Sequence, residues 1–272
     1  SRARPLSIRG QGQDARLLAA AIPWPMCFSA AASFTAAATL VPLGLAAGSL
    51  SLRQGQGALL PLALVPVFFG LQQGLEGVVW LTVEQEGGSI WLSPAALGYL
   101  FFAYLFWLVW IPWSALRLER STPGLLRRPA MLGLLSLGLL IGVLLWLPLL
   151  LDPGRLAPAV VKGSLAYNAR LLGDGWINLR LGSFVYGLII TLPLLLLPQA
   201  GMRIFGITLV LSYVLSQLMY VYAFTSVWCF FSALLSGMIL WLVLDSSPPE
   251  AERTPTLSAA NGADCGPGEG LG

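Results

Sequence analysis

Histidine is absent from this sequence, lysine occurs once, and charged residues of either sign are scarce. Charged residues make up 10% of the 272 residues, whereas soluble domains carry roughly a quarter. With a hydrophobic fraction of 57% and a mean hydropathy of +0.78, the chain cannot have water as its main solvent. The absence of histidine removes the commonest general base and the usual ligand of zinc, haem and copper sites. We therefore expect a membrane protein without a metal site.

Motifs that would identify other chemistry are missing as well. The cysteines are Cys27, Cys229 and Cys265, and none forms a CxxC pair, which excludes the common redox and iron–sulfur motifs. No phosphate-binding GxxxxGK[ST] loop or HExxH motif occurs. The net charge of +3 is too small and too dispersed for a nucleic-acid partner. No motif identifies a cofactor.

Long apolar stretches dominate the middle of the chain. A helix needs about 20 mostly apolar residues to cross the hydrocarbon core. Seven stretches qualify, near residues 28–50, 58–82, 93–116, 129–150, 181–199, 203–224 and 226–244. We therefore predict an all-α integral membrane bundle of about seven transmembrane helices, forming one domain over residues 26–244. The boundary near Thr225 and Ser226 is the weakest, because a single long helix is the alternative there.

The two ends of the chain differ from this domain. We expect the native protein to begin at Met26, with residues 1–25 as a non-native or disordered extension. Residues 245–272 are rich in proline, glycine, serine and alanine, with almost nothing large and apolar to bury. We expect this tail to be disordered.

The composition of individual segments predicts their surroundings. The first span, rich in alanine, serine and threonine, is expected inside the bundle, and the leucine-rich stretch 132–151 is expected to face lipid broadly. Trp107, Trp110 and Trp113 are interpreted as an interfacial aromatic belt, with a pigment- or lipid-binding surface as the alternative. The loop around residues 159–172 suggests a short amphipathic helix on the membrane, either a lid or a plain surface helix.

Arginine is distributed unevenly between the loops. The loops after the first, third and fifth spans carry arginines, densest between residues 117 and 128, whereas the loop with Glu84 and Glu86 carries no cation. Cytoplasmic loops are enriched in arginine and lysine. We therefore place the 117–128 loop and the C-terminus in the cytoplasm, and the N-terminus and the 151–180 loop outside.

Glu76 is the one acidic residue well within a predicted span. Helical spacing places Gln72 and Gln73 one turn before it and Trp80 one turn after it on a common face. A charged carboxylate at this depth costs roughly 2.5–3.5 kcal/mol, so Glu76 is expected to face the bundle. It either carries a ligand-binding or protonatable function or bridges two helices.

Other polar residues fall at a similar predicted depth in the outer half of the membrane. They are Ser29 and Ser33 in the first span, Gln217 and Tyr220 in the sixth, and Ser232 in the seventh. Each row alone is typical of helix packing, but together with Glu76 they predict an outer polar pocket. Cys27 and Cys229 flank it, either as buried free thiols or as a disulfide in the oxidising compartment.

Three motifs resemble a known family. They are Met26-Cys27-Phe28-Ser29-Ala30, the Gln-Gln-x-x-Glu-Gly-x-x-Trp pattern from Gln72 to Trp80, and the segment Trp228-Cys229-Phe230-Phe231-Ser232-Ala233. Together they resemble an uncharacterised bacterial family of multi-pass membrane proteins, a domain of unknown function, over residues 26–244. The resemblance implies a bacterial, inner or plasma membrane. It also implies that Cys27, Ser29, Gln72, Gln73, Glu76, Trp80, Trp228 and Cys229 are family motif positions, and it assigns no activity.

Four functions remain open. The first is binding or sensing of a small apolar or amphipathic ligand in the pocket around Glu76. The second is proton-coupled transport through Glu76, and the third is a structural subunit of a membrane complex. An enzyme using Glu76 as general acid or base comes last, because histidine and a second intramembrane acid are missing. The implied partners are the lipid bilayer, a small apolar ligand and another membrane protein.

Overall fold

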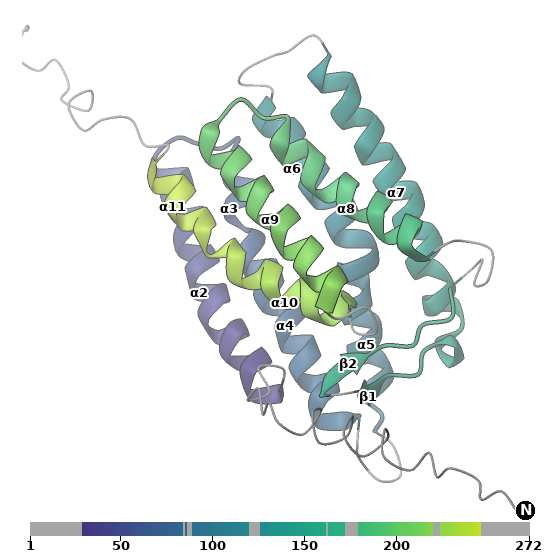
Figure 1. The fold of residues 1–272 in the computed structure, drawn as a ribbon. Helices are drawn as coiled ribbons and strands as arrows, with labels where there is room; N and C mark the ends of the chain where they lie inside the picture. Colours follow the sequence, from purple (N-terminus) through teal and green to yellow (C-terminus); the bar gives the residue numbers. More distant parts are fainter. Residues whose placement is uncertain are drawn as a thin grey trace, which may run out of the picture.

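The computed structural model describes residues 29–83, 85, 89–119, 126–161, 163–171, 179–219 and 224–245. Its helices lie side by side in a bundle, and a small hairpin closes one end (Figure 1). The elements are α2 (Ala30–Arg53), α3 (Leu60–Ala63), α4 (Val65–Thr82), α5 (Leu92–Phe101), the π-helix η1 (Phe102–Phe106), α6 (Trp107–Glu119), α7 (Arg127–Leu151), the 3₁₀-helix η2 (Pro153–Arg155), β1 (Ala159–Val161), β2 (Ser164–Ala166), α8 (Leu179–Leu195), α9 (Ala200–Met219), α10 (Phe224–Ser236) and α11 (Met238–Asp245).

Within the described ranges, five helical segments are long and apolar enough to cross a membrane. They are Ala30–Arg53, Leu60–Thr82, Leu92–Glu119, Arg127–Leu151 and Ala200–Leu218, and the shorter apolar helices Leu181–Leu195 and Phe231–Asp245 accompany them. The expected all-helical fold with membrane-spanning helices is confirmed at this level. Thr225 and Ser226 lie within α10, so the boundary expected there is wrong. Since α10 packs against α9, with Trp228 hydrogen-bonded to Ser212, the alternative of one long helix is wrong as well.

The first helix shows how local sequence sets the boundaries. Ser29 is the N-cap of α2, and its hydroxyl accepts a hydrogen bond of 3.2 Å from the backbone N–H of Ala32. At the other end Gly55 adopts a φ of 71°, and the N–H of Gln56 donates to the carbonyl of Ser51 at 2.9 Å. Glycine reaches this left-handed conformation without steric penalty, which ends the helix.

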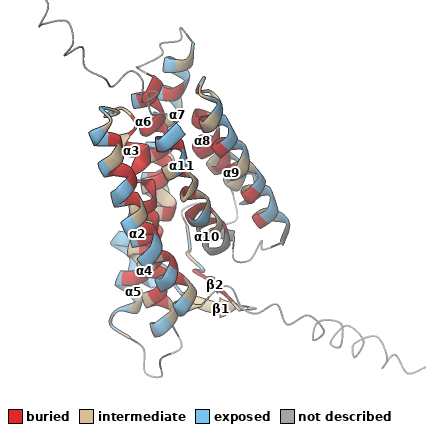
Figure 2. Ribbon diagram, turned by 90° about the vertical axis from the view of Figure 1, so that its left-hand side faces the viewer, coloured by how far each residue is buried: buried red, intermediate tan, exposed pale blue. Residues whose placement is uncertain are grey.

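Glycines bring α2 and α4 into close antiparallel contact. A Cβ atom on Gly44 would lie 2.6 Å from the backbone nitrogen of Val67, and one on Gly70 would lie 2.7 Å from a methyl carbon of Val41. Small residues permit such close approach of helices in membranes. The opposite face of α2 is exposed at the edge of the bundle (Figure 2). The expectation that this helix lies inside was wrong, because only its small-residue stripe is packed.

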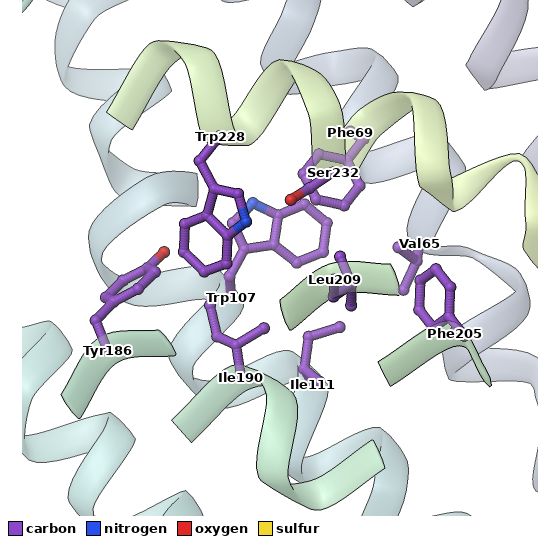
Figure 3. A pocket seen from close by; sticks show the side chains of 10 residues that line it. All are labelled: Val65, Phe69, Trp107, Ile111, Tyr186, Ile190, Phe205, Leu209, Trp228 and Ser232. Carbon is purple, nitrogen blue, oxygen red and sulfur yellow. The ribbon is translucent and has the colours of Figure 1, made fainter. Parts of the chain in front are cut away.

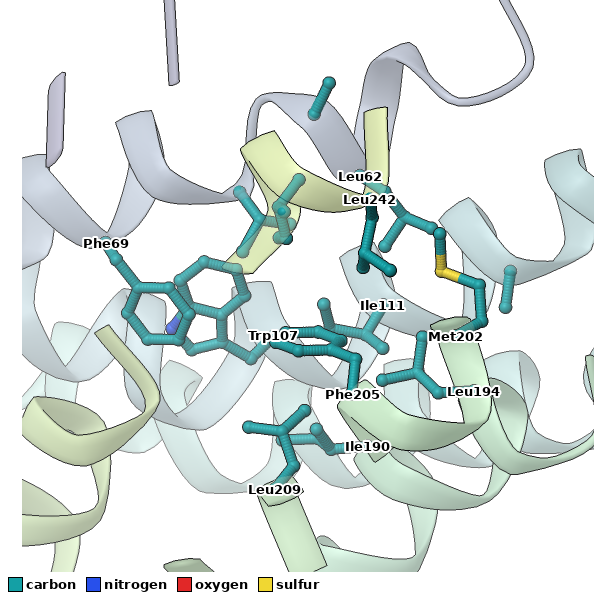
Figure 4. Packing of buried hydrophobic residues seen from close by; sticks show 14 of the residues in the cluster. Leu62, Phe69, Trp107, Ile111, Ile190, Leu194, Met202, Phe205, Leu209 and Leu242 are labelled. Carbon is teal, nitrogen blue, oxygen red and sulfur yellow. The ribbon is translucent and has the colours of Figure 1, made fainter. Parts of the chain in front are cut away.

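The main hydrophobic core lies where α3, α4, α6, α8, α9 and α11 meet (Figure 4). Its largest members include Phe69, Trp107 and Phe205. By contrast, α7 exposes most of its leucines, as expected for the 132–151 stretch, which was predicted to face lipid.

The segment after α7 forms a β-hairpin rather than the expected amphipathic helix. Val160 pairs with Leu165 and Val161 with Ser164 in an antiparallel register. Gly163, with a φ of 75°, supplies the turn. The β-branched pair Val160–Val161 favours a strand. The amphipathic spacing that suggested a helix therefore reflects a hairpin whose second strand is buried.

A buried polar row and an aromatic cavity

The polar face of α4 points into the bundle. This helix packs against α2, α5 and α10, and Phe69, Gln72, Gln73 and Glu76 are all buried. Glu76 is 2% exposed, which confirms that it does not face lipid. Membrane interiors make such polar groups costly, so the fold holds them away from the bilayer.

Gln72 joins α4 to α6. Its side-chain oxygen accepts a 2.7 Å hydrogen bond from Nε1 of Trp107, and the Trp107 ring stacks on Phe69 at 3.9 Å between centroids. Because Trp107 is 2% exposed, its assignment to an interfacial belt was wrong. Trp113 fits that role better, since it is half-buried with the Arg117 guanidinium 5.6 Å from its ring centroid.

Gln73 has a different environment from its neighbour. Its side chain is 0% exposed, and neither its Nε2 nor its Oε1 has a hydrogen-bond partner in the structure as described. An unsatisfied buried amide costs about 1–3 kcal/mol. Such exceptions call for a specific explanation, such as a site for a bound polar molecule. Gln73 thus presents one acceptor and two donor positions beside Glu76.

An aromatic cavity lies along the same face of α4. Five aromatic residues, four aliphatic residues and one hydroxyl form its wall, and its free volume is about 30 Å³. Figure 3 shows the lining residues, which are Val65, Phe69, Trp107, Ile111, Tyr186, Ile190, Phe205, Leu209, Trp228 and Ser232. Two hydrogen-bond donors on the lining residues bond to partners outside the cavity. Trp228 Nε1 donates to Ser212 Oγ at 3.2 Å, and the Tyr186 hydroxyl donates to the carbonyl of Ala103. The wall is therefore almost entirely apolar.

A π-helical turn borders this cavity. In η1 the regular α-helical hydrogen bonding shifts by one residue, and Tyr186 from α8 satisfies one of its carbonyls. Such turns occur frequently at functional sites. Sequence reasoning missed both η1 and Tyr186, because the run from Phe101 to Trp107 has the composition of any membrane helix. A tyrosine within an apolar span, whose hydroxyl needs a hydrogen-bond partner, was the available signal.

The remaining predicted site residues are dispersed. Ser29 acts as a helix cap. Ser33 is buried near the level of Glu76, since the adjacent Phe34 ring lies 2.8 Å from a Cβ built on Gly77. Gln217 is half-buried and donates to the Tyr213 hydroxyl at 3.5 Å. Of the predicted set, Ser232 lines the cavity directly. Trp80 is half-buried against the second hydrophobic cluster.

Three predicted positions lie outside this description. Tyr220, Cys27 and the side chain of Cys229 are not among the described residues, so the proposed cysteine pair stays a prediction. For the described part of the chain, no group of three or more cysteine, aspartate or glutamate side chains could hold a metal ion.

The hairpin covers the end of α4 that carries Glu76. Leu165 and Tyr167 belong to the same buried cluster as Val79, one turn beyond Glu76. The Tyr167 ring stacks on Tyr99 of α5 with centroids 4.6 Å apart, and β2 also contacts α10. The polar row is therefore closed from this end of the bundle.

Comparison with known proteins gives a family without an activity. No curated protein and no solved structure was found to match the chain. One family model, described as "Family of unknown function (DUF6629)", matches residues 26–254. The match covers the whole bundle, including the polar row and the cavity. The chain therefore belongs to DUF6629, a family of unknown function.

Proposed function

We propose that this protein is a seven-helix membrane protein that binds the polar group of a small amphipathic molecule at Gln73 and Glu76. The observation that carries the proposal is the fully buried Gln73 amide, whose two polar atoms have no hydrogen-bond partner among the described residues. A bound hydroxyl, carboxylic acid or amide would supply both a donor and an acceptor. Glu76, one turn away, adds a carboxyl group to the same face.

The arrangement of the two shorter apolar helices supports seven crossings. α8 and the broken helix α10–α11 lie alongside the five long segments (Figure 1). Described arginines at the end away from the hairpin include Arg53, Arg117, Arg127, Arg128 and Arg203. By the arginine bias of cytoplasmic loops, that end faces the cytoplasm and the hairpin faces outward. The binding site then lies in the outer half of a bacterial inner membrane.

The sign of a stability change tests the proposal. Met at position 73 keeps much of the side-chain volume and removes the unsatisfied amide. We expect Gln73→Met to raise the free energy of unfolding of the ligand-free protein by about 1 kcal/mol. If Gln73 served only to bridge helices, the same change would lower it. Unfolding in mixed micelles of dodecyl maltoside and dodecyl sulfate measures the difference.

Ligand-induced stabilisation gives the second readout. A molecule that binds only the folded state raises the melting temperature. We expect decanoic acid or decan-1-ol to raise the melting temperature of the wild type in nanodiscs and to leave the melting temperature of Gln73→Met unchanged. Gln85→Met, at an exposed position near the end of α4, is the matched control and should respond like the wild type. Equal responses of wild type and Gln73→Met to both compounds would refute the proposal.

A further inference from the structure

The face of α4 changes character along its length. Gln73 and Glu76 occupy the part nearer the hairpin, and Phe69 and Val65 follow at successive turns away from it. Both apolar residues line the aromatic cavity. Residues four apart on a helix share a face, so the Gln73 amide lies one turn from the cavity wall. A polar site and an apolar cavity therefore adjoin along one line.

From this juxtaposition we infer that the ligand is a single-chain amphiphile, a carboxylic acid or alcohol with one unbranched hydrocarbon chain. This inference rests on the proposed binding of its polar group at Gln73. The head group hydrogen-bonds with Gln73, and the chain runs along α4 past Phe69 into the cavity. Five aromatic residues and the Ser232 hydroxyl are among the groups that line the cavity at the end of the chain (Figure 3).

The size of the cavity selects one chain over a ring or a two-chain lipid. Its free volume is about 30 Å³, whereas an apolar cavity of about 150 Å³ is known to hold benzene. A space of this size has room for about two water-sized groups, so it fits the tip of a methylene chain, whereas a ring would have to displace the stacked Phe69 and Trp107. The indole donors of Trp107 and Trp228 are already hydrogen-bonded elsewhere, so the wall favours an apolar occupant.

The distance along α4 fixes the chain length. Eight residues separate Gln73 from Val65, which at about 1.5 Å per residue is about 12 Å, the reach of roughly eight to ten carbon atoms. A chain of six carbons would end near Phe69 and leave the far part of the cavity empty. Binding affinity should therefore depend on chain length, because only the longer chains reach Val65.

Bromine at the end of the chain provides the probe, because it quenches the fluorescence of a tryptophan that it touches. Trp107 and Trp228 line the cavity. We expect 10-bromodecanoic acid and 6-bromohexanoic acid to give saturable quenching of the full-length protein in phosphatidylcholine nanodiscs. Val65→Ile adds one methyl group to the cavity wall. It should weaken binding of the ten-carbon probe roughly tenfold and change that of the six-carbon probe less than about twofold.

Two further variants keep the test decisive. Val143→Ile makes the same change on the exposed face of α7 and should leave both probes unaffected. Val65→Leu enlarges the same side chain with a different shape and should reproduce the selective loss, which covers the case that Val65→Ile does not fold. Equal weakening of both probes, or no weakening of the longer one, would overturn the chain placement. Gln73→Met should abolish saturable quenching by both probes, and persistence of that quenching would instead refute the binding of the head group.

Discussion

The segment Leu60–Thr82 and helix α7 have similar lengths but opposite surroundings. Leu60–Thr82 has the lower mean hydropathy, 1.4, and 61% of its most apolar stretch is buried, whereas α7 has a mean hydropathy of 2.6 and 17% buried. In water the more apolar helix would be inside. In a bilayer lipid tails solvate leucine as well as a protein core does, so apolar surface alone does not drive helices together. The more polar of the two segments is therefore the central one.

Both helices nevertheless use glycine for their close contacts. On α4, Gly70 and Gly77 accommodate Val41 and Phe34 of α2. On α7, Gly138 and Gly142 accommodate the backbone of Leu108 and the side chain of Leu105. The difference is that α4 is packed around most of its circumference and α7 along one narrow stripe. Substitutions in that stripe should therefore destabilise the protein, whereas substitutions on the rest of α7 should have little effect.

The largest effect is expected when the glycine stripe of α7 is broken. A Cβ on Gly138 would overlap the carbonyl oxygen of Leu108, which is backbone and cannot move away easily. Gly138→Ala should therefore lower the free energy of unfolding by about 2–3 kcal/mol. Gly133→Ala is the matched control, since nothing lies within 4 Å of a Cβ there, and its better helix propensity should add up to about 1 kcal/mol. Unfolding in dodecyl sulfate measures both, and equal effects would contradict the packing of α7 on α6.

A smaller loss is expected when the polar contact of α4 is broken. Gln72→Leu leaves the buried indole N–H of Trp107 without its acceptor, which should cost about 1–2 kcal/mol. Trp107→Phe removes the donor instead. In the double variant the penalty for the orphaned N–H disappears, so the two losses should sum to more than the loss of the double variant. Strict additivity in this cycle would show that the hydrogen bond contributes nothing to stability.

Much of the fold was predictable because the bilayer imposes one dominant constraint. Long apolar stretches must be helical to satisfy their backbone groups in lipid, and the exposure of most leucines between Leu132 and Leu151 was predictable from composition alone. The hairpin was not predictable in this way. It lies outside the apolar spans, where the same spacing of Val161 and Leu165 is compatible with a helix or with two short strands, and tertiary contact with Tyr99 and α10 decides.

The candidate site was predictable in part for a similar reason. Glu76 had to be buried, because the energetic penalty of an ionisable group in lipid depends little on the details of packing. The difference between Gln72 and Gln73 depends on where Trp107 lies, and that requires the three-dimensional arrangement. Likewise, the cavity arises from five helices meeting, and no local pattern around Tyr186 or Phe205 indicates it.

The smallest effect is expected on the exposed face of α7, where it tests whether lipid is the only neighbour. Leu140 is 58% exposed there. Its truncation in Leu140→Ala should change the free energy of unfolding by less than about 0.5 kcal/mol, because lipid replaces the lost side chain without leaving a cavity. The same substitution at Leu149, a buried position of the same helix, should cost about 2 kcal/mol and serves as the positive control. A loss above about 1 kcal/mol at Leu140 would mean that protein, not lipid, covers this face, since only packed side chains leave cavities on truncation. Cross-linking of wild type and Leu140→Ala would then show whether that covering protein is a second copy of this chain or another subunit of a membrane complex.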